Sequence, residues 1–287
     1  MNDKKTPVVD IMCYLFTHEN IQKCFWDAPE FRRVIEWWGL AEKTKGRSVQ
    51  EFTDFLDEAG VDKVCMPAVK MKAWRENRLI WDVSVDEIYE TTKKNPDRFV
   101  GFAGVNPFAG RKGVQEVEHA VKDLGFKGVY LHTYGFDIPI NDKLYYPYYE
   151  KCVELGVGIS MQVGHSAELM PSAHGRPIFI EDIALDFPEL NIVGAHTGWP
   201  WVEEMIAMAW KFPNVYLGID AHMPKYLDPS IVRFIKTRGK GKVVWGTNYP
   251  AIYQKEALDQ IREWQLRPEV EAGLIGGTAA KIFNLDK

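Results

Sequence analysis

The stretch 187–199, Phe-Pro-Glu-Leu-Asn-Ile-Val-Gly-Ala-His-Thr-Gly-Trp, holds a helix stop, a short strand and a polar turn, in that order. The Phe-Pro pair at 187–188 ends a helical pattern, and 191–196 is an apolar run without polar alternation. Such a run is typical of a strand with both faces buried, as in a parallel sheet covered by helices. Apolar residues then recur from Val202 to Ala209 at helical spacing. The stretch therefore predicts one strand followed by one helix, with His196 at the carboxyl end of the strand.

The same alternation of apolar run and helical pattern occurs eight times along the chain. The predicted strands are 8–16, 63–67, 99–105, 128–132, 158–163, 191–196, 214–219 and 242–246. Eight strands, each followed by a helix, favour a closed (β/α)8 TIM barrel over an open doubly wound sheet. No Gly-x-Gly-x-x-Gly follows an early strand, which disfavours a dinucleotide site. A length of 287 residues fits one α/β barrel domain over 1–287.

The connection between the first two predicted strands is the unusual one. It covers 17–61 and contains Trp26, Trp37 and Trp38. This is too long for a plain crossover. We therefore expect a helical insertion after the first strand, or a lid over the mouth of the barrel.

Composition and charge restrict the class of protein. The formal net charge is −5 and no basic stripe is present, so nucleic acid is not an expected partner. The apolar run near the N-terminus is too short to cross a membrane and lacks a signal-peptide cleavage pattern. The four cysteines form no Cys-x-x-Cys pair, as expected of reduced thiols in a cytoplasmic protein. The aromatic residues around 199–201 and in the insertion predict a homodimer.

Histidines gather at the ends of the predicted strands. Four of the seven lie there: His132, His165, His196 and His222. In a TIM barrel the active site is formed at the carboxyl ends of the strands. His165 and His196 are the strongest candidates, because each ends an apolar strand and is followed by small residues. His132 and His222 each fit a structural role as well as a substrate-binding one.

Other polar and aromatic residues near strand ends are candidates for substrate binding. They are Asp10, Tyr14, Tyr130 and Trp199, and Asn248 is a further candidate within the catalytic group. Asp10 lies inside an apolar strand, where a buried carboxylate needs a partner. It either orients a residue of the site or satisfies backbone donors.

Several segments, taken together and in order, resemble the amidohydrolase-2 family, which includes aminocarboxymuconate-semialdehyde decarboxylases. The resemblance covers about residues 50–287 well, and the first strand by position. The segments are Asn-Pro-Asp-Arg-Phe at 95–99, Gly-Phe-Lys-Gly-Val at 125–129, Gly-Arg-Pro at 175–177, the stretch 187–196, Gly-Thr-Asn-Tyr-Pro at 246–250, and Gly-Gly-Thr-Ala-Ala-Lys-Ile-Phe at 276–283. The resemblance implies a single TIM barrel and an enzyme of hydrolase or lyase type.

The resemblance also implies roles for residues, and the first strand departs from the family's pattern. The family opens with Asp-x-His-x-His, whose histidines hold a divalent metal, whereas this chain has Met12 and Tyr14 at the two histidine positions. Methionine is a poor ligand for zinc or manganese, and neutral tyrosine is a weak one.

Later strands retain part of the family's pattern. His165 matches the metal histidine of strand five, and His196 matches a proton-transfer histidine of the decarboxylases. Asn248 replaces the aspartate of strand eight, and an amide cannot act as a base. We therefore expect no resident metal; if a divalent metal such as zinc is bound, His165 and His196 would hold it.

Three functions are open at this point. The first is a metal-independent hydrolase or isomerase of a small carboxylated or lactone-type substrate, with His165 and His196 as acid and base. In it, Tyr14, Tyr130 and Asn248 would hydrogen-bond the substrate. The second is a metal-dependent decarboxylase or hydrolase with altered ligands. The third is a catalytically inactive homologue that binds a small ligand.

Overall fold

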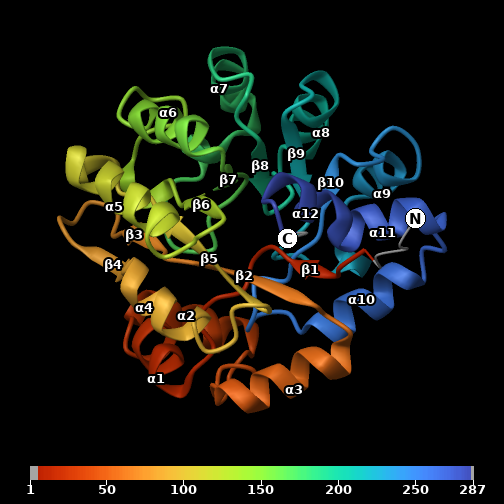
Figure 1. The fold of residues 1–287 in the computed structure, drawn as a ribbon, viewed down its shortest axis with the longest axis horizontal. Coiled ribbons are helices and arrows are strands. Elements are labelled where there is room, and N and C mark those ends of the chain that lie inside the picture. The colour runs from red at the N-terminus through yellow and green to blue at the C-terminus, as the bar shows by residue number, and fades with distance from the viewer. Residues whose placement is uncertain (1–5, 286–287) are drawn as a thin grey trace.

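Eight parallel strands form the centre of the molecule and neighbour one another in chain order (Figure 1). The computed structural model describes residues 6–285. The strands are β1 (Val9–Asp10), β2 (Lys63–Pro67), β5 (Phe99–Gly104), β6 (Gly128–Leu131), β7 (Gly158–Gln162), β8 (Ile192–Ala195), β9 (Val215–Gly218) and β10 (Val243–Val244). All eight lie within the predicted ranges, and nearly every residue in them is buried, so the predicted barrel is confirmed.

The first and last strands meet just beyond their assigned ends and close the barrel. Cys13 and Tyr249 form a parallel bridge, and the Asn248 amide donates to the Met12 carbonyl at 2.8 Å. Asp10 strengthens this seam, since its carboxylate accepts from the backbone of Thr247 at 2.9 Å and from the hydroxyl of Thr247 at 2.5 Å. Asp10 is fully buried, so these donors supply the partners that a buried carboxylate requires.

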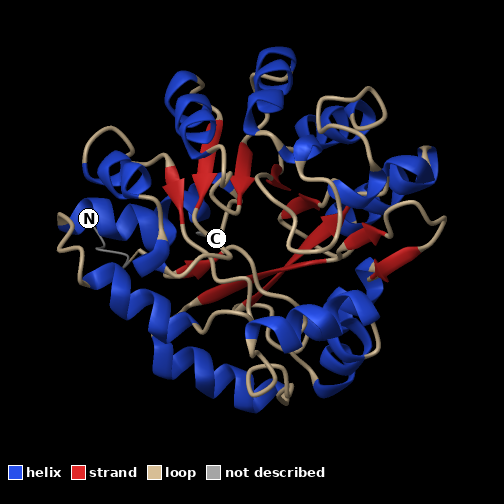
Figure 2. Cartoon of the chain, turned by 180° about the vertical axis from the view of Figure 1, so that it is seen from behind, coloured by secondary structure: helices blue, strands red, loops and turns tan. Residues whose placement is uncertain are grey.

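Helices form a ring outside the strands (Figure 2). They are α3 (Val49–Ala59), α4 (Val85–Thr92), α5 (Arg111–Lys122), α6 (Tyr146–Leu155), α7 (Ile180–Asp186), α8 (Val202–Lys211), α9 (Pro229–Lys236) and α10 (Gln254–Arg262). Their starts follow from local sequence: α3 begins with a capping box between Ser48 and Glu51, and ends where Gly60 takes a left-handed conformation. Short helical turns lie in the loops: η2 (Pro107–Ala109), η3 (Tyr134–Phe136), η4 (Ala173–Gly175), η5 (Pro177–Phe179) and η6 (Pro224–Tyr226).

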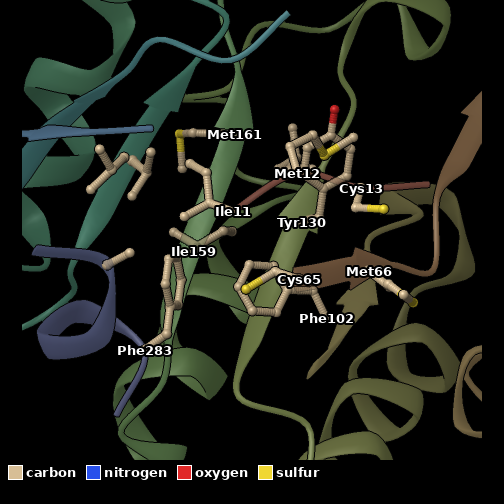
Figure 3. Packing of buried hydrophobic residues seen from close by; sticks show 14 of the residues in the cluster. Ile11, Met12, Cys13, Cys65, Met66, Phe102, Tyr130, Ile159, Met161 and Phe283 are labelled. Atoms are coloured by element: carbon tan, nitrogen blue, oxygen red, sulfur yellow. The ribbon is translucent and has the colours of Figure 1, made fainter. Parts of the chain in front are cut away.

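The C-terminal helices cover the amino end of the barrel. They are α11 (Pro268–Ala272), η7 (Gly273–Gly277) and α12 (Thr278–Ile282). Phe283 packs on Phe102, with 4.6 Å between ring centroids, and both rings lie in the apolar interior (Figure 3). A Cβ atom on Gly128 would approach both rings to about 3.0 Å, so glycine at the start of β6 lets Phe283 pack closely. With this end filled, a ligand must enter from the carboxyl ends of the strands.

The connection after β1 contains helices that pack over the mouth of the barrel. They are α1 (His18–Ile21), the π-helical turn η1 (Gln22–Trp26) and α2 (Pro29–Trp38), and we call residues 17–44 the cover segment. A short hairpin that the sequence did not predict, β3 (Lys70–Lys72) and β4 (Leu79–Asp82), lies against it. Trp81 of β4 stacks on Phe31 at 4.1 Å and donates its indole hydrogen bond to the Cys24 carbonyl at 2.6 Å.

One buried apolar cluster runs through the described residues, so the chain is a single domain. All four cysteines are buried and free. Within residues 6–285, no helix is both long enough and apolar enough to span a membrane.

Candidate active site

A cavity of about 80 Å³ lies between the carboxyl ends of the strands and the cover segment. Its barrel side is lined by Tyr14, Gln162, His165, Ala167, Glu168, His196, Ala221, His222, Asn248, Pro250 and Ala251. Its cover side is mostly apolar, with Phe25, Phe31, Val34, Ile35, Trp38, Leu40 and Thr44. The cavity therefore has polar groups on its barrel side and apolar side chains on its cover side. This composition is typical of a small-molecule binding site.

A larger groove of about 510 Å³ lies on the outside, between α8 and α9. It is lined by helix residues such as Trp210 and Arg233 and contains no histidine or strand end. The cavity at the carboxyl ends of the strands is therefore the candidate active site.

His196 is held by a buried aspartate. Its Nδ1 lies 2.6 Å from Oδ2 of Asp220, and its backbone amide donates to Oδ1 of the same carboxylate at 3.0 Å. Burial opposes ionisation of Asp220, but the attraction and hydrogen bonds of His196 outweigh it and lower the pKa of Asp220. Asp220 is thus a carboxylate that fixes the imidazole tautomer, with Nδ1 protonated, and leaves Nε2 for a substrate.

The backbone is strained where these side chains enter the site. His196, Thr197, Ala221 and Asn248 have φ values of 67°, 62°, 63° and 63°, a left-handed conformation that non-glycine residues rarely adopt. Each such residue costs on the order of 1–3 kcal/mol, and such strain concentrates at functional sites. Its position at the ends of β8, β9 and β10 supports the assignment of this cavity as the site.

His165 and His222 are neutral imidazoles near pH 7. Burial, followed by the proximity of His196, lowers the pKa of His165 below its usual value. Burial also lowers the pKa of His222 to about 4. The ring of His165 lies edge-on to Trp199 at 4.9 Å and 6.3 Å from the ring of His222. Both rings can exchange hydrogen bonds with a ligand, but neither brings a positive charge to the cavity.

Tyr14 and Asn248 supply hydrogen-bonding groups to the same cavity. Burial, reinforced by the charges of Glu168 and Asp220, raises the pKa of Tyr14 far above its usual value, so its hydroxyl stays a donor. Oδ1 of Asn248 is buried and has no hydrogen-bond partner within residues 6–285. An unpaired buried amide is costly, and a ligand that pairs with it gains that free energy.

Glu168 is an acidic residue of the cavity that the sequence did not single out. Its Oε2 accepts from the Ser166 hydroxyl at 2.6 Å and lies 3.8 Å from Nε2 of His132. The 3.8 Å separation is too long for a hydrogen bond. Burial opposes ionisation, but His132 and Ser166 together lower the pKa of Glu168 to about 2. Glu168 therefore brings a negative charge to the cavity at neutral pH.

Five of the predicted site residues line the cavity: Tyr14, His165, His196, His222 and Asn248. The other four do not. Asp10 serves the barrel seam, and Tyr130 is buried and donates to Oε1 of Gln162 at 3.1 Å. His132 is buried beside Glu168, and Trp199 is half exposed at the edge of His165.

Sequence reasoning missed Asp220 and Glu168 as members of the site. Asp220 offered a signal, because an aspartate directly after a buried strand lies at the same barrel end as the histidines. Glu168 offered none beyond its place in the loop after His165, since the path of that loop depends on contacts with distant residues.

A ring of eight parallel strands with convergent histidines at their carboxyl ends is the arrangement of TIM-barrel enzymes. The chain belongs to the amidohydrolase family, whose model matches residues 38–285. The family predicted from the sequence is thereby confirmed.

Three relatives show how far the similarity extends. A 2-amino-3-carboxymuconate-6-semialdehyde decarboxylase of Dictyostelium discoideum is 21% identical over 242 residues, covering 70% of this chain and 65% of that protein. An uncharacterised TIM-barrel protein from Bordetella bronchiseptica has a TM-score of 0.80 at 23% identity, covering 97% of this chain and 99% of that one. A dihydroxybenzoic acid decarboxylase from Polaromonas sp., with bound manganese and the inhibitor 2-nitroresorcinol, has a TM-score of 0.72 at 18% identity and covers 98% of each chain.

Three of the side chains at the family's metal positions, Met12, Tyr14 and Asn248, are poor ligands for a divalent metal. Met12 is fully buried among the apolar side chains of the barrel interior (Figure 3), and the Tyr14 hydroxyl stays protonated. Asn248 offers one neutral oxygen, so His165 and Nε2 of His196 are the strong donors left at the barrel mouth. Across residues 6–285, no three histidine, cysteine or acidic side chains form a group that could hold a metal ion. Zinc and manganese sites usually require three such ligands.

Proposed function

We propose that the chain is a metal-independent hydrolase or isomerase that acts on a small lactone-type substrate, with His196 as the acid–base residue. The observation that carries this proposal is the 2.6 Å contact of His196 with buried Asp220 at the cavity wall. A histidine oriented by a carboxylate is a general base whose protonated form the carboxylate stabilises. His165 acts with His196 as the second imidazole of the site.

For lactone hydrolysis, Nε2 of His196 takes a proton from water, and the water oxygen bonds to the lactone carbonyl carbon. The carbonyl oxygen becomes negative and accepts hydrogen bonds from the Tyr14 hydroxyl and the Asn248 amide, which act as an oxyanion site. The ring C–O bond then breaks, and the departing alkoxide takes the proton from the His196 imidazolium. Asp220 stabilises the imidazolium throughout and exchanges no proton.

The charge of the lining favours a lactone over a carboxylate among the two substrate types that the sequence predicted. Among residues 6–285, no lysine or arginine lines the cavity, whereas ionised Glu168 does. With His165 and His222 neutral, nothing fixed in the wall balances a substrate carboxylate. An uncharged ring enters without that desolvation cost.

The size of the cavity favours a small ring. About 80 Å³ is space for roughly five to eight water-sized groups. The cover segment forms the apolar side of the cavity, so we also propose that this segment opens as a lid to admit substrate and release product.

Decarboxylation is the second candidate, and the activities of the similar decarboxylases favour it. Loss of carbon dioxide leaves a carbanion that must receive a proton, and His196 is placed to deliver one. This candidate needs a carboxylated substrate, which the charge of the cavity disfavours. The third candidate, an inactive ligand-binding homologue, fits the lost metal ligands but not the retained His196–Asp220 pair.

Two expectations from the sequence remain predictions. Homodimer formation would bury exposed aromatic residues, of which Trp37 is 79% and Trp199 49% exposed. A cytoplasmic location is the second prediction, and the four free cysteines fit it.

The proposal is tested by screening purified protein against small lactones, including D-glucono-δ-lactone and dihydrocoumarin, and against small aromatic carboxylates. Ring opening is followed with a pH indicator, and carbon dioxide release is followed in parallel. On the substrate found, His196→Ala should lower kcat by about 10²–10⁴-fold. The exposed His119→Ala should not change it. Full activity in His196→Ala would overturn the proposal, and carbon dioxide release would replace it with the second candidate.

A further inference from the structure

Within residues 6–285, hydrogen bonds and charged contacts from other side chains reach only one oxygen of the Glu168 carboxylate. Both close contacts, with the Ser166 hydroxyl and with His132, use Oε2. Oε1 accepts no hydrogen bond from another side chain within residues 6–285, although Glu168 lines the cavity. A carboxylate oxygen that no other side chain occupies, on a residue that lines the cavity, is available to a hydrogen-bond donor of a ligand.

His132 gives a second, independent indication. It is almost completely buried, and neither ring nitrogen has a hydrogen-bond partner within residues 6–285. Its nearest polar contact is Glu168, at 3.8 Å. A histidine that serves only packing would be expected to satisfy at least one nitrogen. The unpaired nitrogens of His132 therefore mark, beside Glu168, a second buried polar group without a partner.

The loop that carries Glu168 is fixed from two sides. The Ser166 amide donates to the Ser172 hydroxyl at 3.0 Å, and Arg33 of α2 donates to the Ala167 carbonyl at 3.1 Å. The second contact joins the loop to the cover segment. The position of the loop that carries Glu168 therefore depends in part on a contact with the cover segment.

We propose that Glu168 is a specificity-determining residue that accepts, through Oε1, a hydrogen bond from a hydroxyl group of a neutral ring substrate. The same charge repels a carboxylate in that position. A hydroxylated lactone or other uncharged hydroxylated ring is the substrate class that fits. The proposal rests on the proposed function only in taking this cavity as the substrate site, and it does not depend on the reaction.

This role also suits the proposed reaction. Hydrolysis of a lactone produces a carboxylate where the carbonyl was. The negative charge of Glu168 disfavours that product and leaves the neutral substrate unaffected. Glu168 would thus favour binding of the neutral substrate and assist release of the charged product.

Phenol and benzoate are the probes that separate hydrogen bonding by Glu168 from repulsion by its charge. Both are small rings, and only phenol is neutral at pH 7. Isothermal titration of the whole chain should show phenol binding at least about tenfold more tightly than benzoate. Glu168→Gln keeps the size of the side chain and removes its charge. It should reduce that ratio by about tenfold or more, through weaker phenol binding and stronger benzoate binding.

Glu263→Gln, an exposed glutamate at the end of α10, is the matched control and should keep the wild-type ratio. If Glu168→Gln does not fold, Glu168→Asp keeps the charge beside His132 but withdraws the carboxylate from the cavity. It should weaken phenol binding while benzoate stays excluded. The proposal would be overturned by absence of phenol binding to the wild-type chain, by a preference for benzoate, or by an unchanged ratio in the folded variants.

The binding test of Glu168 can be separated from the test of the proposed reaction. His196→Ala should keep the preference for phenol, because that preference depends on the charge of Glu168 and not on proton transfer by His196. If the ratio depends on Glu168 while His196→Ala keeps full turnover, the proposed function fails and the role of Glu168 stands. If His196→Ala loses turnover and the phenol-to-benzoate ratio does not depend on Glu168, the proposed function stands and the role of Glu168 fails.

Discussion

Nδ1 of His196 lies 2.6 Å from Oδ2 of Asp220, and the backbone amide of His196 donates to the other oxygen of the same carboxylate. Asp220 therefore fixes both the ring and the backbone of the histidine. The chain offers a natural comparison in the exposed pair His119 and Asp123, whose contact is 2.7 Å. The two pairs have nearly the same geometry, and they differ in burial and in what they face.

Replacing Asp220 by asparagine should lower kcat by about 10²–10⁴-fold with little change in KM. Asparagine keeps the shape of the side chain but neither stabilises the imidazolium nor enforces the tautomer. Steady-state kinetics on the substrate identified above measure the effect. Asp123→Asn is the control and should leave kcat unchanged. A kcat for Asp220→Asn within twofold of wild type would mean that the buried pair is structural.

Replacing Tyr14 by phenylalanine should lower kcat by about 10²–10³-fold, because it removes one donor to the developing negative oxygen. The ring and its edge contact with Trp81 at 4.9 Å are kept, so the fold should be unaffected. Tyr146→Phe is the matched control, because it removes a surface hydroxyl that donates to Asp186. Equal kcat values for the two variants would exclude Tyr14 from the oxyanion site.

His222 should make stability depend on pH between about 6.5 and 4. Burial lowers its folded pKa to about 4, so between the two values the unfolded chain binds a proton that the folded chain does not. The free energy of unfolding should therefore fall as the pH drops from 6.5 towards 4. Urea unfolding at several pH values should show a shallower fall in His222→Asn than in wild type. His119→Ala, at the surface, should keep the wild-type slope, and identical slopes for all three proteins would contradict this prediction.

Phe31 should anchor the cover segment. Its ring stacks on Trp81 and is buried, so Phe31→Ala should lower the free energy of unfolding by about 3–5 kcal/mol, or release the cover segment alone. Either result would be seen by thermal unfolding together with proteolysis between residues 17 and 44. Trp37→Ala on the same helix removes a ring that is 79% exposed and should change stability by less than about 0.5 kcal/mol. Similar effects of the two substitutions would show that the cover segment is not anchored through Phe31.

The sequence predicted the barrel well because the physical signal was local. Each barrel strand is buried on both faces, so apolar runs such as 158–163 stand out from the helices around them. The β3–β4 hairpin was missed because its short strands contain Lys70, Lys72 and Asp82. Its apolar residue Trp81 packs against the cover segment, which local sequence does not indicate.

The site was predictable to the extent that strand ends define it. His165, His196 and Asn248 follow strands directly, and the barrel brings all three to one cavity. Glu168 lies on a loop whose position depends on Arg33, 134 residues away in sequence. For Asp10 the sequence left open a role in the site or the pairing of backbone donors, and its carboxylate accepts from the Thr247 backbone at the barrel seam.

Metal content measured together with turnover tests the central claim most directly. The protein is purified without added ions and treated with a chelator, its zinc and manganese are determined by mass spectrometry, and kcat/KM is measured on the same sample. We predict full activity at well below one equivalent of metal, and no gain when manganese or zinc is returned. Activity that vanishes with the chelator and returns in proportion to one bound metal per chain would contradict acid–base catalysis by His196 and Asp220 without a metal.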